Sequence, residues 1–231
     1  MDFTTVTTLD IPEGKVSSIS YNGKVLWQCG VPLAEIAIGA TVNIKENSGY
    51  VPYIVVAHDY IKTGTTTLLR RNPTSGSNFW ASAPSSVYNN KYSMSSLEIA
   101  MSNYWAFYMP EETQALFQLV KVPVRDNANA SCDAVTVNAY LFPLSTMEMT
   151  GDGSTKEGTY LPYFSSGYSI AASESYWTRS VTGGMAGYAR AINTSGEVSS
   201  VSVTNSRALR PAGCIPYDTL VVKQGGSYYI L

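Results

Sequence analysis

Hydrophobic and polar residues alternate most regularly in two runs, residues 187–192 and 198–204, which are joined by Asn193-Thr194-Ser195-Gly196. Because successive residues of a strand point to opposite faces of a sheet, this alternation predicts two half-buried strands. A short connection that ends in glycine predicts that the two strands form a β-hairpin. We call residues 187–205 the ribbon.

Shorter apolar runs predict further strands elsewhere in the chain. Residues 36–44, 51–57 and 65–69 are separated by turns that contain glycine, which favours a meander of antiparallel strands. Residues 119–124 and 134–141 predict two more strands. Near the C-terminus, residues 219–222 and 228–231 flank Gly225-Gly226 and predict a final hairpin.

Three short helices are predicted from their start signals. Ser95-Ser96-Leu97-Glu98 is a capping-box pattern, and its helix should run to about Asn103. Proline followed by two acidic residues at Pro110-Glu111-Glu112 predicts a second helix of two turns. Ser145-Thr146-Met147-Glu148 is another capping box, which opens a short third helix.

The N-terminal segment, residues 1–30, forms a small β element of its own in this interpretation. Asn22-Gly23 lies between two alternating runs, and both residues accept the positive φ of a type I′ hairpin turn. An element of about 30 residues buries too little surface to fold alone. It should therefore pack on the main domain, on another subunit or on a larger assembly. The predicted organisation is α+β: an N-terminal β element (1–30), a main domain (31–215) and a C-terminal hairpin packed on it (216–231).

The composition of the 231 residues argues against two classes of partner. Charged residues make up 14%, below the roughly 25% of a typical soluble domain, so Ser, Thr, Asn, Gly and the 17 tyrosines should cover the surface. A net charge of -2 offers no positive field for nucleic acid. No apolar run approaches the roughly 18 residues of a membrane span, and the N-terminus lacks the features of a signal peptide. We expect a soluble protein that does not insert into membranes.

Candidate catalytic residues are few. Any Ser-His-Asp triad would need His58, the single histidine, and no G-x-S-x-G motif occurs. His58 follows a strand that looks buried, which favours a structural role, and we expect no enzyme activity. Cys29, Cys132 and Cys214 are odd in number and lack metal-site spacing, so they are interpreted as free, mostly buried thiols, with one disulfide open to them in an oxidising medium.

No metal or cofactor is expected. Thr150-Gly151-Asp152-Gly153-Ser154 has oxygens that calcium could use, but it lacks the acidic residues and the closing glutamate of a calcium loop, which favours a plain turn. Arg70 and Arg71 could form an anion site. A solvated or structurally paired role is favoured for both.

The ribbon carries a set of side chains that suits recognition. Tyrosine supplies rigid contact area, and small polar residues supply adaptable hydrogen bonds, as in antibody paratopes. An ordinary polar outer face of a hairpin explains the same residues, and both readings remain open. The candidate ligand-binding residues are Tyr188, Arg190, Asn193, Thr194, Ser199, Ser200, Ser202, Thr204 and Asn205.

Two motifs flank the ribbon, Trp177-Thr178-Arg179-Ser180 and Arg207-Ala208-Leu209-Arg210-Pro211-Ala212. With their W-x-R-S and x-x-R-P-A patterns, residues 31–215 resemble a domain of uncharacterised function that recurs in gut Firmicutes and their phages. That domain looks like a branch of the C-type-lectin-like fold shared with formylglycine-generating enzymes and with the variable proteins of diversity-generating retroelements. The motif positions would then hold the fold together: Trp177, Arg179, Arg207, Arg210 and Pro211.

The resemblance also bears on chemistry. Formylglycine-generating enzymes use a pair of cysteines near the end of the domain, and only Cys214 lies in that region here. Calcium-dependent C-type lectins use Glu-Pro-Asn or Gln-Pro-Asp together with Trp-Asn-Asp, and none of these triplets is present. The resemblance therefore implies a lectin-like domain that binds without catalysis.

The N-terminal motifs, residues 11–16 and 23–27, are similar to the openings of structural and tail proteins of phages that infect gut Firmicutes. This similarity implies a virion protein, made in the host cytoplasm, whose residues 1–30 attach to other virion proteins. Such proteins are often symmetric, so a homo-oligomer, for example a trimer, is expected. Two hypotheses follow: a receptor-binding protein that contacts a host-surface glycan or protein, and an architectural component such as a capsid decoration or tail assembly protein.

Overall fold

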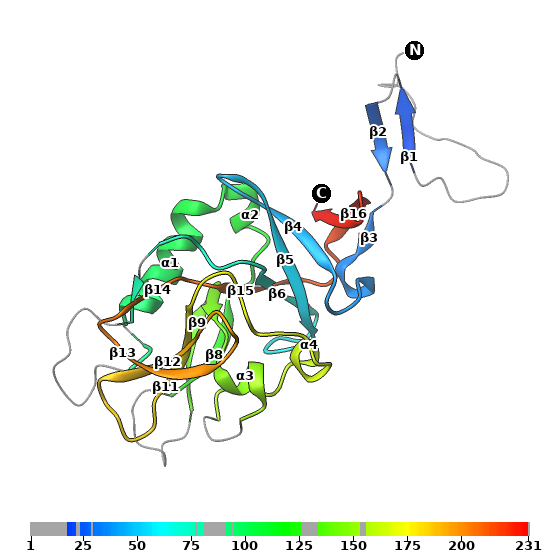
Figure 1. Ribbon diagram of the computed structural model, residues 1–231. Helices are drawn as coiled ribbons and strands as arrows, with labels where there is room; N and C mark the ends of the chain where they lie inside the picture. The colour runs from blue at the N-terminus through cyan, green and yellow to red at the C-terminus, as the bar shows by residue number, and fades with distance from the viewer. Residues whose placement is uncertain are drawn as a thin grey trace.

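The computed structural model describes most of the chain, and the statements below concern only the described residues. They are residues 18–21, 24–28, 30–76, 78–80, 91–93, 95–125, 134–152 and 156–230. They form a mixed α+β structure of mostly antiparallel sheets with a few short helices (Figure 1). This class agrees with the prediction.

The largest sheet has eight strands in the order β10-β15-β6-β5-β4-β17-β16-β3. Its neighbours are antiparallel except for β17 and β4, which run parallel. The predicted meander is confirmed as β4-β5-β6, and the predicted C-terminal hairpin is confirmed as β16-β17. The strands are β3 (Val31–Pro32), β4 (Thr41–Glu46), β5 (Gly49–His58), β6 (Thr65–Arg70), β10 (Leu141–Pro143), β15 (Pro211–Pro216), β16 (Leu220–Gln224) and β17 (Ser227–Ile230).

Two predicted strands are wrong in extent. The run at residues 36–44 becomes a strand only from Thr41, because a 3-10 helix, η1 (Leu33–Glu35), precedes it and Gly39 has a left-handed φ of 89°. The run at residues 134–141 divides into β9 (Val135–Ala139) and β10, because these pieces pair with different partners. β9 pairs with β8 (Val120–Val124), whereas β10 pairs with β15.

The helices match the predicted starts better than the predicted ends. α1 (Ser96–Tyr108) continues beyond Asn103, and α2 (Glu111–Gln114) is shorter than the two turns expected. At the start of α1 the Ser95 hydroxyl accepts from the Glu98 amide, while the Ser95 amide donates to the Tyr92 carbonyl. α3 (Thr146–Thr150) has the complete capping box, and α4 (Pro162–Ser165), with proline in its first turn, was not predicted.

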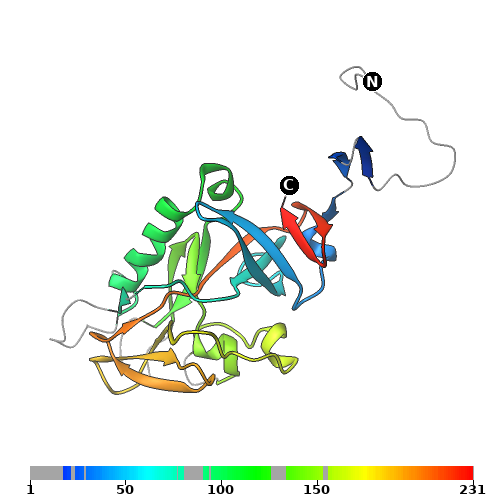
Figure 2. The same ribbon diagram turned by 45° about the horizontal axis from the view of Figure 1, so that its top comes forward.

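The ribbon hairpin is confirmed as the outer part of a three-stranded sheet. β11 (Tyr176–Val181) pairs with β12 (Tyr188–Ile192), which pairs with β13 (Val198–Ser202). A short strand that follows, β14 (Ser206–Arg207), pairs with β7 (Asn78–Phe79). In Figure 2 this sheet lies along one side of the molecule and α1 along another.

The predicted N-terminal hairpin is also present, as β1 (Ser18–Tyr21) and β2 (Lys24–Gln28). It forms a two-stranded sheet of its own, and Figure 1 shows it beyond β3, away from the body of the protein. The predicted turn residues Asn22 and Gly23 lie outside the described residues.

One hydrophobic core joins the main sheet, α1 and the ribbon sheet. α1 packs on β10 and β7, α4 packs on β5, and β11 packs on β10 and α3. The largest buried side chains include Trp80, Trp177 and Tyr53, with Trp80 and Trp177 meeting edge to face at 5.9 Å. Across the described ranges, no helix combines the length and apolar character that a membrane crossing requires.

Candidate functional site

Arg179 forms the centre of a buried ionic cluster beneath the ribbon. It lies on β11 and is 0% exposed. Its Nη1 and Nη2 atoms donate to the two carboxylate oxygens of Glu148, each at 2.5 Å. The remaining donors reach the carbonyl oxygens of Pro123 (2.9 Å), Pro143 (3.0 Å) and Glu157 (2.8 Å). A guanidinium group has five N–H donors, so Arg179 has none left for a ligand.

Glu148 connects this cluster to α3 and to the β5–β6 turn. Its carboxylate accepts from the Ser145 amide at 2.7 Å, which completes the capping box, and from the Tyr60 hydroxyl. Burial alone would lower the pKa of Arg179, but the Glu148 carboxylate outweighs burial and the pKa is raised. Burial, followed by the charge of Glu148, raises the pKa of Tyr60. The cluster therefore stays ionised at Arg179 and protonated at Tyr60.

A second acid, Glu157, lies at the edge of this cluster and is fully buried. One carboxylate oxygen accepts from the Arg125 amide at 3.1 Å. Burial raises the pKa of Glu157 to about 7, against the opposing charge of Arg179. Glu157 therefore titrates near neutral pH.

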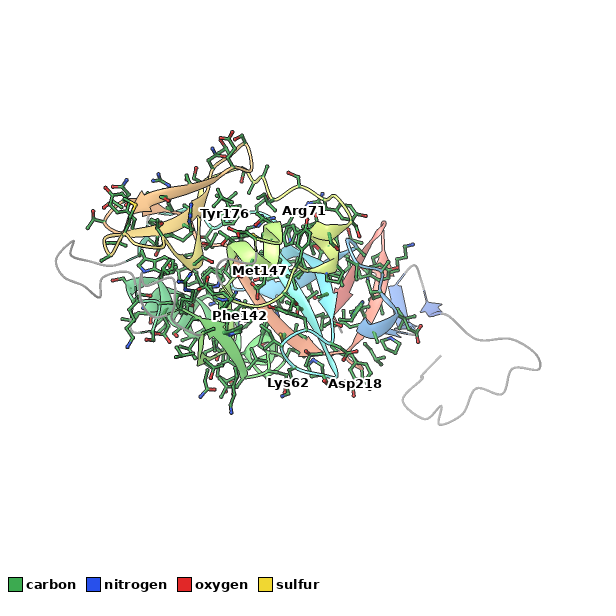
Figure 3. All side chains as sticks on the ribbon, turned by 90° about the horizontal axis from the view of Figure 1, so that it is seen from below. Lys62, Arg71, Phe142, Met147, Tyr176 and Asp218 are labelled. Carbon is green, nitrogen blue, oxygen red and sulfur yellow. The ribbon has the colours of Figure 1, made fainter. Side chains whose placement is uncertain are left out.

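Arg210 joins three segments at the other end of the ribbon sheet. It donates to the carbonyl oxygens of Arg70 (3.1 Å), Arg71 (3.0 Å) and Ile170 (3.2 Å) and to the Tyr176 hydroxyl (2.9 Å). Its guanidinium also lies over the Tyr176 ring at 4.9 Å from the centroid. Figure 3 places Tyr176 at the root of the ribbon and Lys62 and Asp218 toward the other side of the molecule.

The remaining motif residues have less uniform environments. The Trp177 ring nitrogen donates to the Asn78 carbonyl at 2.7 Å, and Pro211 pairs with Pro143 in the main sheet. Arg207 donates to the carbonyl of its neighbour Ser206 at 2.6 Å. Within the described residues its side chain makes no hydrogen bond to another element, so its side-chain contacts do not resemble those of Arg179 and Arg210.

Strand alternation sorts the candidate ligand-binding residues of the ribbon. Tyr188 faces Ser202 across the hairpin and Arg190 faces Ser200, so these four side chains share one face. Tyr188 is 39% exposed, and Ser200 is exposed as well. The opposite face carries Ala189, Ala191 and Val201, which are buried. We call Tyr188, Arg190, Ser200 and Ser202 the ribbon face.

The other predicted residues do not belong to that face. Ser199 pairs with Ala191 on the inner side, and its hydroxyl donates to the Ala191 carbonyl at 3.4 Å. Thr194 is exposed at the tip, and Asn205 is exposed after β13. Thr204 lies 3.0 Å from Ser202, hydroxyl to hydroxyl.

Asn193 is engaged within the turn. Its side-chain oxygen accepts from the amides of Ser195 (3.0 Å) and Glu197 (2.9 Å), and its nitrogen donates to the Glu197 carboxylate at 2.8 Å. The nine predicted residues therefore form one face of four, a tip and several supporting positions.

His58 has both ring nitrogens engaged. Nε2 donates to the Ile36 carbonyl at 3.0 Å, because that oxygen only accepts, and Nδ1 lies 2.9 Å from the Thr66 hydroxyl. Both ring nitrogens therefore have structural partners. Cys214 is a free buried thiol beside Thr67, and burial raises its pKa. Cys29 and Cys132 lie outside the described residues.

The two other candidate ion sites have structural contacts. At the last residue of α3, the Thr150 hydroxyl donates to the Thr146 carbonyl at 2.8 Å, while Gly153 and Ser154 lie outside the described residues. Arg70 forms an ion pair with buried Glu46 at 3.0 Å, as the paired role predicted. Among the residues with described positions, no three of the types His, Cys, Asp and Glu gather closely enough to hold a metal ion.

Comparison with known families identifies the region that contains these features. A family model described as a domain of unknown function (DUF6273) matches residues 63–217, more than half of the chain. The chain belongs to the DUF6273 family. A search of curated proteins found no match, and neither did a search of solved structures.

The DUF6273 match includes both arginine clusters, the ribbon and helices α1 to α4. It begins in the turn between β5 and β6 and ends directly after β15. The N-terminal hairpin, β3, η1, β4, β5 and the C-terminal hairpin lie outside it. The main sheet of this DUF6273 protein is therefore completed by strands from both sides of the family region.

Proposed function

We propose that this DUF6273 protein is a non-catalytic component of a phage virion that binds a host-surface ligand, a glycan or a protein, through the ribbon face. The observation that carries the proposal is the position of Tyr188, Arg190, Ser200 and Ser202 on the outer side of a hairpin whose inner side is core. Tyrosine with small polar neighbours is the composition that recognition surfaces use.

The residues that hold the ribbon in place favour a binding function for the ribbon face over the alternative of an ordinary polar surface. Arg179 anchors β11 from below, and Arg210 anchors its first residue, Tyr176, from the side. A binding surface gains affinity when its residues are held before the ligand arrives, because less entropy is lost on binding. The ribbon is held in this way at its root, while its outer face has no core function.

We further propose that the DUF6273 region has a C-type-lectin-like fold. The W-x-R-S and x-x-R-P-A segments, about thirty residues apart in sequence, lie side by side: the Trp177 amide donates to the Ala208 carbonyl at 3.2 Å. This pairing brings the two ends of the ribbon region together, as the proposed fold requires. The hydrogen bond of His58 to a backbone carbonyl and the raised pKa of the buried Cys214 thiol support a role without catalysis.

The N-terminal hairpin supports the virion part of the proposal. Within the described residues it forms a separate two-stranded sheet whose outer edges pair with no other strand, and residues 1–30 would attach the domain to other virion proteins through such edges. A homo-oligomer, such as a trimer, would present several ribbon faces together and raise the overall affinity for a repetitive surface.

A binding assay tests the site assignment. The fluorescently labelled protein is incubated with cells from a panel of gut Firmicutes, and the amount bound is compared with that of the Tyr188→Ala/Arg190→Ala double variant. Because central aromatic and arginine residues dominate interface energies, we expect binding to fall by about tenfold or more. Tyr217→Ala is the matched control, since Tyr217 is similarly exposed (46%) but lies after β15, outside the ribbon.

Two outcomes would contradict the proposal. Equal binding by the double variant would reject the ribbon face as the contact surface. Failure of the unaltered protein to bind any cell in the panel would reject host recognition and favour the architectural role. One feature supports that alternative: α1 exposes Phe107 (71%) and Ile99 (55%), the kind of apolar side chains that subunit contacts cover. In an assembled particle the ribbon face would then be buried between subunits.

A further inference from the structure

A pocket separate from the ribbon face lies between the C-terminal half of α1 and the segment that precedes β7. Its volume is about 370 Å³, within the range of small-molecule sites. The pocket shares no lining residue with the ribbon face. The side chains used in the argument below are Thr74, Ser75, Asn78, Asn103, Tyr104 and Tyr108.

Two tyrosine rings provide a platform in this pocket. Tyr104 and Tyr108 lie one helical turn apart and stack with an interplanar angle of 9° and a centroid distance of 5.2 Å. Tyr104 is 6% exposed, whereas Tyr108 is 59% exposed. The outer ring is therefore available to a ligand and is backed by a buried ring.

The rest of the pocket supplies neutral hydrogen-bonding groups. Asn78 and Asn103 bring amides, which both donate and accept, and Thr74 and Ser75 bring hydroxyls. The side-chain amide of Asn103 makes no hydrogen bond to any described residue. The Thr74 hydroxyl oxygen accepts from the Leu209 amide at 3.3 Å and keeps its own proton for donation. None of these six lining residues is charged.

One buried carboxylate fixes both walls of the pocket. Glu46 accepts from the Tyr104 hydroxyl at 2.7 Å, which sets the platform on the α1 side. It also pairs with Arg70, whose Nη1 atom donates to the carbonyls of Asn72 (2.6 Å) and Pro73 (3.1 Å), directly before the opposite wall begins at Thr74. Because Glu46 is 4% exposed and its bond to Tyr104 is buried, the platform is fixed before any ligand binds.

We propose that this pocket binds a neutral saccharide unit, with the C–H face of a sugar ring on Tyr108 and its hydroxyls on the amides and hydroxyls of the lining. A phosphate or an amine would find no opposite charge among the six lining side chains used in this argument. A purely apolar ligand would leave the amides unpaired, which costs binding energy. A sugar hydroxyl can both donate and accept a hydrogen bond. It therefore matches the asparagine side chains, which donate from the nitrogen and accept at the oxygen.

Titration by NMR tests this assignment on the full chain. The probes are neutral monosaccharides and disaccharides of glucose, galactose, mannose and N-acetylglucosamine, added up to high millimolar concentration. We expect at least one probe to shift the side-chain amide resonance of Asn103. Tyr108→Ala and Asn103→Ala should each weaken that binding by about tenfold, and Tyr108→Phe should retain it because the ring remains.

Phe107→Ala is the matched control, since Phe107 is the adjacent exposed aromatic residue and does not line the pocket. It should leave the titration unchanged, as should Tyr188→Ala/Arg190→Ala, so failure of this site and failure of the ribbon face are distinguishable. The proposal is overturned if no saccharide shifts the spectrum, if Phe107→Ala weakens binding as much as Tyr108→Ala, or if a sugar phosphate binds more tightly than the neutral sugar.

Discussion

Arg179 and Arg190 lie on adjacent strands of one sheet, yet their environments are opposite. Arg179 is fully buried with all five donors engaged, whereas Arg190 is partly exposed and makes no side-chain hydrogen bond to any described residue. The two regions are linked through the backbone, because the Thr178 hydroxyl donates to the Arg190 carbonyl at 2.8 Å. The contrast separates two environments of arginine: one side chain holds buried segments together, and the other lies on the outer face of the hairpin.

Removing the buried charge should have the largest effect on stability. Arg179→Met leaves the Glu148 carboxylate buried without its ion-pair partner, so the free energy of unfolding in urea should fall by about 3–5 kcal/mol. Arg190→Ala, at the exposed position, should change it by less than about 0.5 kcal/mol.

A variant with both charges replaced, Arg179→Met/Glu148→Leu, sharpens this comparison if the single variant does not fold. Replacing a buried pair by apolar residues is far less costly than leaving one charge alone, so the double variant should be more stable than Arg179→Met. Equal losses for Arg179→Met and Arg190→Ala would contradict the division between the two regions.

The second-largest effect should be a pH dependence of stability that comes from Glu157 in the buried cluster. With a folded-state pKa of about 7 and an ordinary value of 4.5, Glu157 holds its proton in the folded protein where the unfolded chain has lost it. The free energy of unfolding should therefore decrease as the pH rises through this window, by on the order of 3 kcal/mol in total. Below the ordinary pKa the penalty from this group is absent.

Glu157→Gln should remove that contribution, because the amide does not titrate. Urea denaturation at several pH values measures the slope for both proteins. The variant should be the more stable one at alkaline pH, with the difference shrinking toward acid pH. An unchanged slope would exclude Glu157 as the titrating group of the cluster.

The smallest predicted effect lies within the ribbon itself. Asn193→Ala removes the acceptor of two turn amides and should cost about 1 kcal/mol of stability. Thr194→Ala, one residue further at the exposed tip, should change stability by less than about 0.5 kcal/mol. Thermal unfolding of the two variants measures whether the Asn193 side chain stabilises the hairpin turn. Similar melting temperatures for the two variants would show that it does not.

The sequence predicted local features of this fold better than distant ones. Hairpins and helix starts depend on neighbouring residues, so the ribbon hairpin, the β16-β17 hairpin and the Ser145 capping box were confirmed. The end of α1 was missed because the aromatic residues 104–108 are divided between core and surface without a regular pattern. About half of the strand predicted at residues 36–44 is absent, because Gly39 has a left-handed backbone conformation. The apolar content of the segment does not reveal that conformation.

The candidate site was predicted in composition and only partly in geometry. Applying strand alternation would have placed Ser199 on the inner side with Ala191, and the turn position of Asn193 would have pointed to its local hydrogen bonds. The partner of Arg179 was harder to find, because Glu148 lies 31 residues away and only the folded chain brings them together. Its one sequence signal was the capping box, which places that glutamate at a helix start.

The order of strands in the main sheet has a consequence for synthesis. β4 is made early, but its edge opposite β5 is covered by β17, whose residues 227–230 are translated more than 180 residues later. Until then the nascent chain carries an open strand edge, which can pair with other chains. Ribosome-bound chains stalled before residue 227 should therefore depend on chaperones more than chains stalled after the hairpin has emerged.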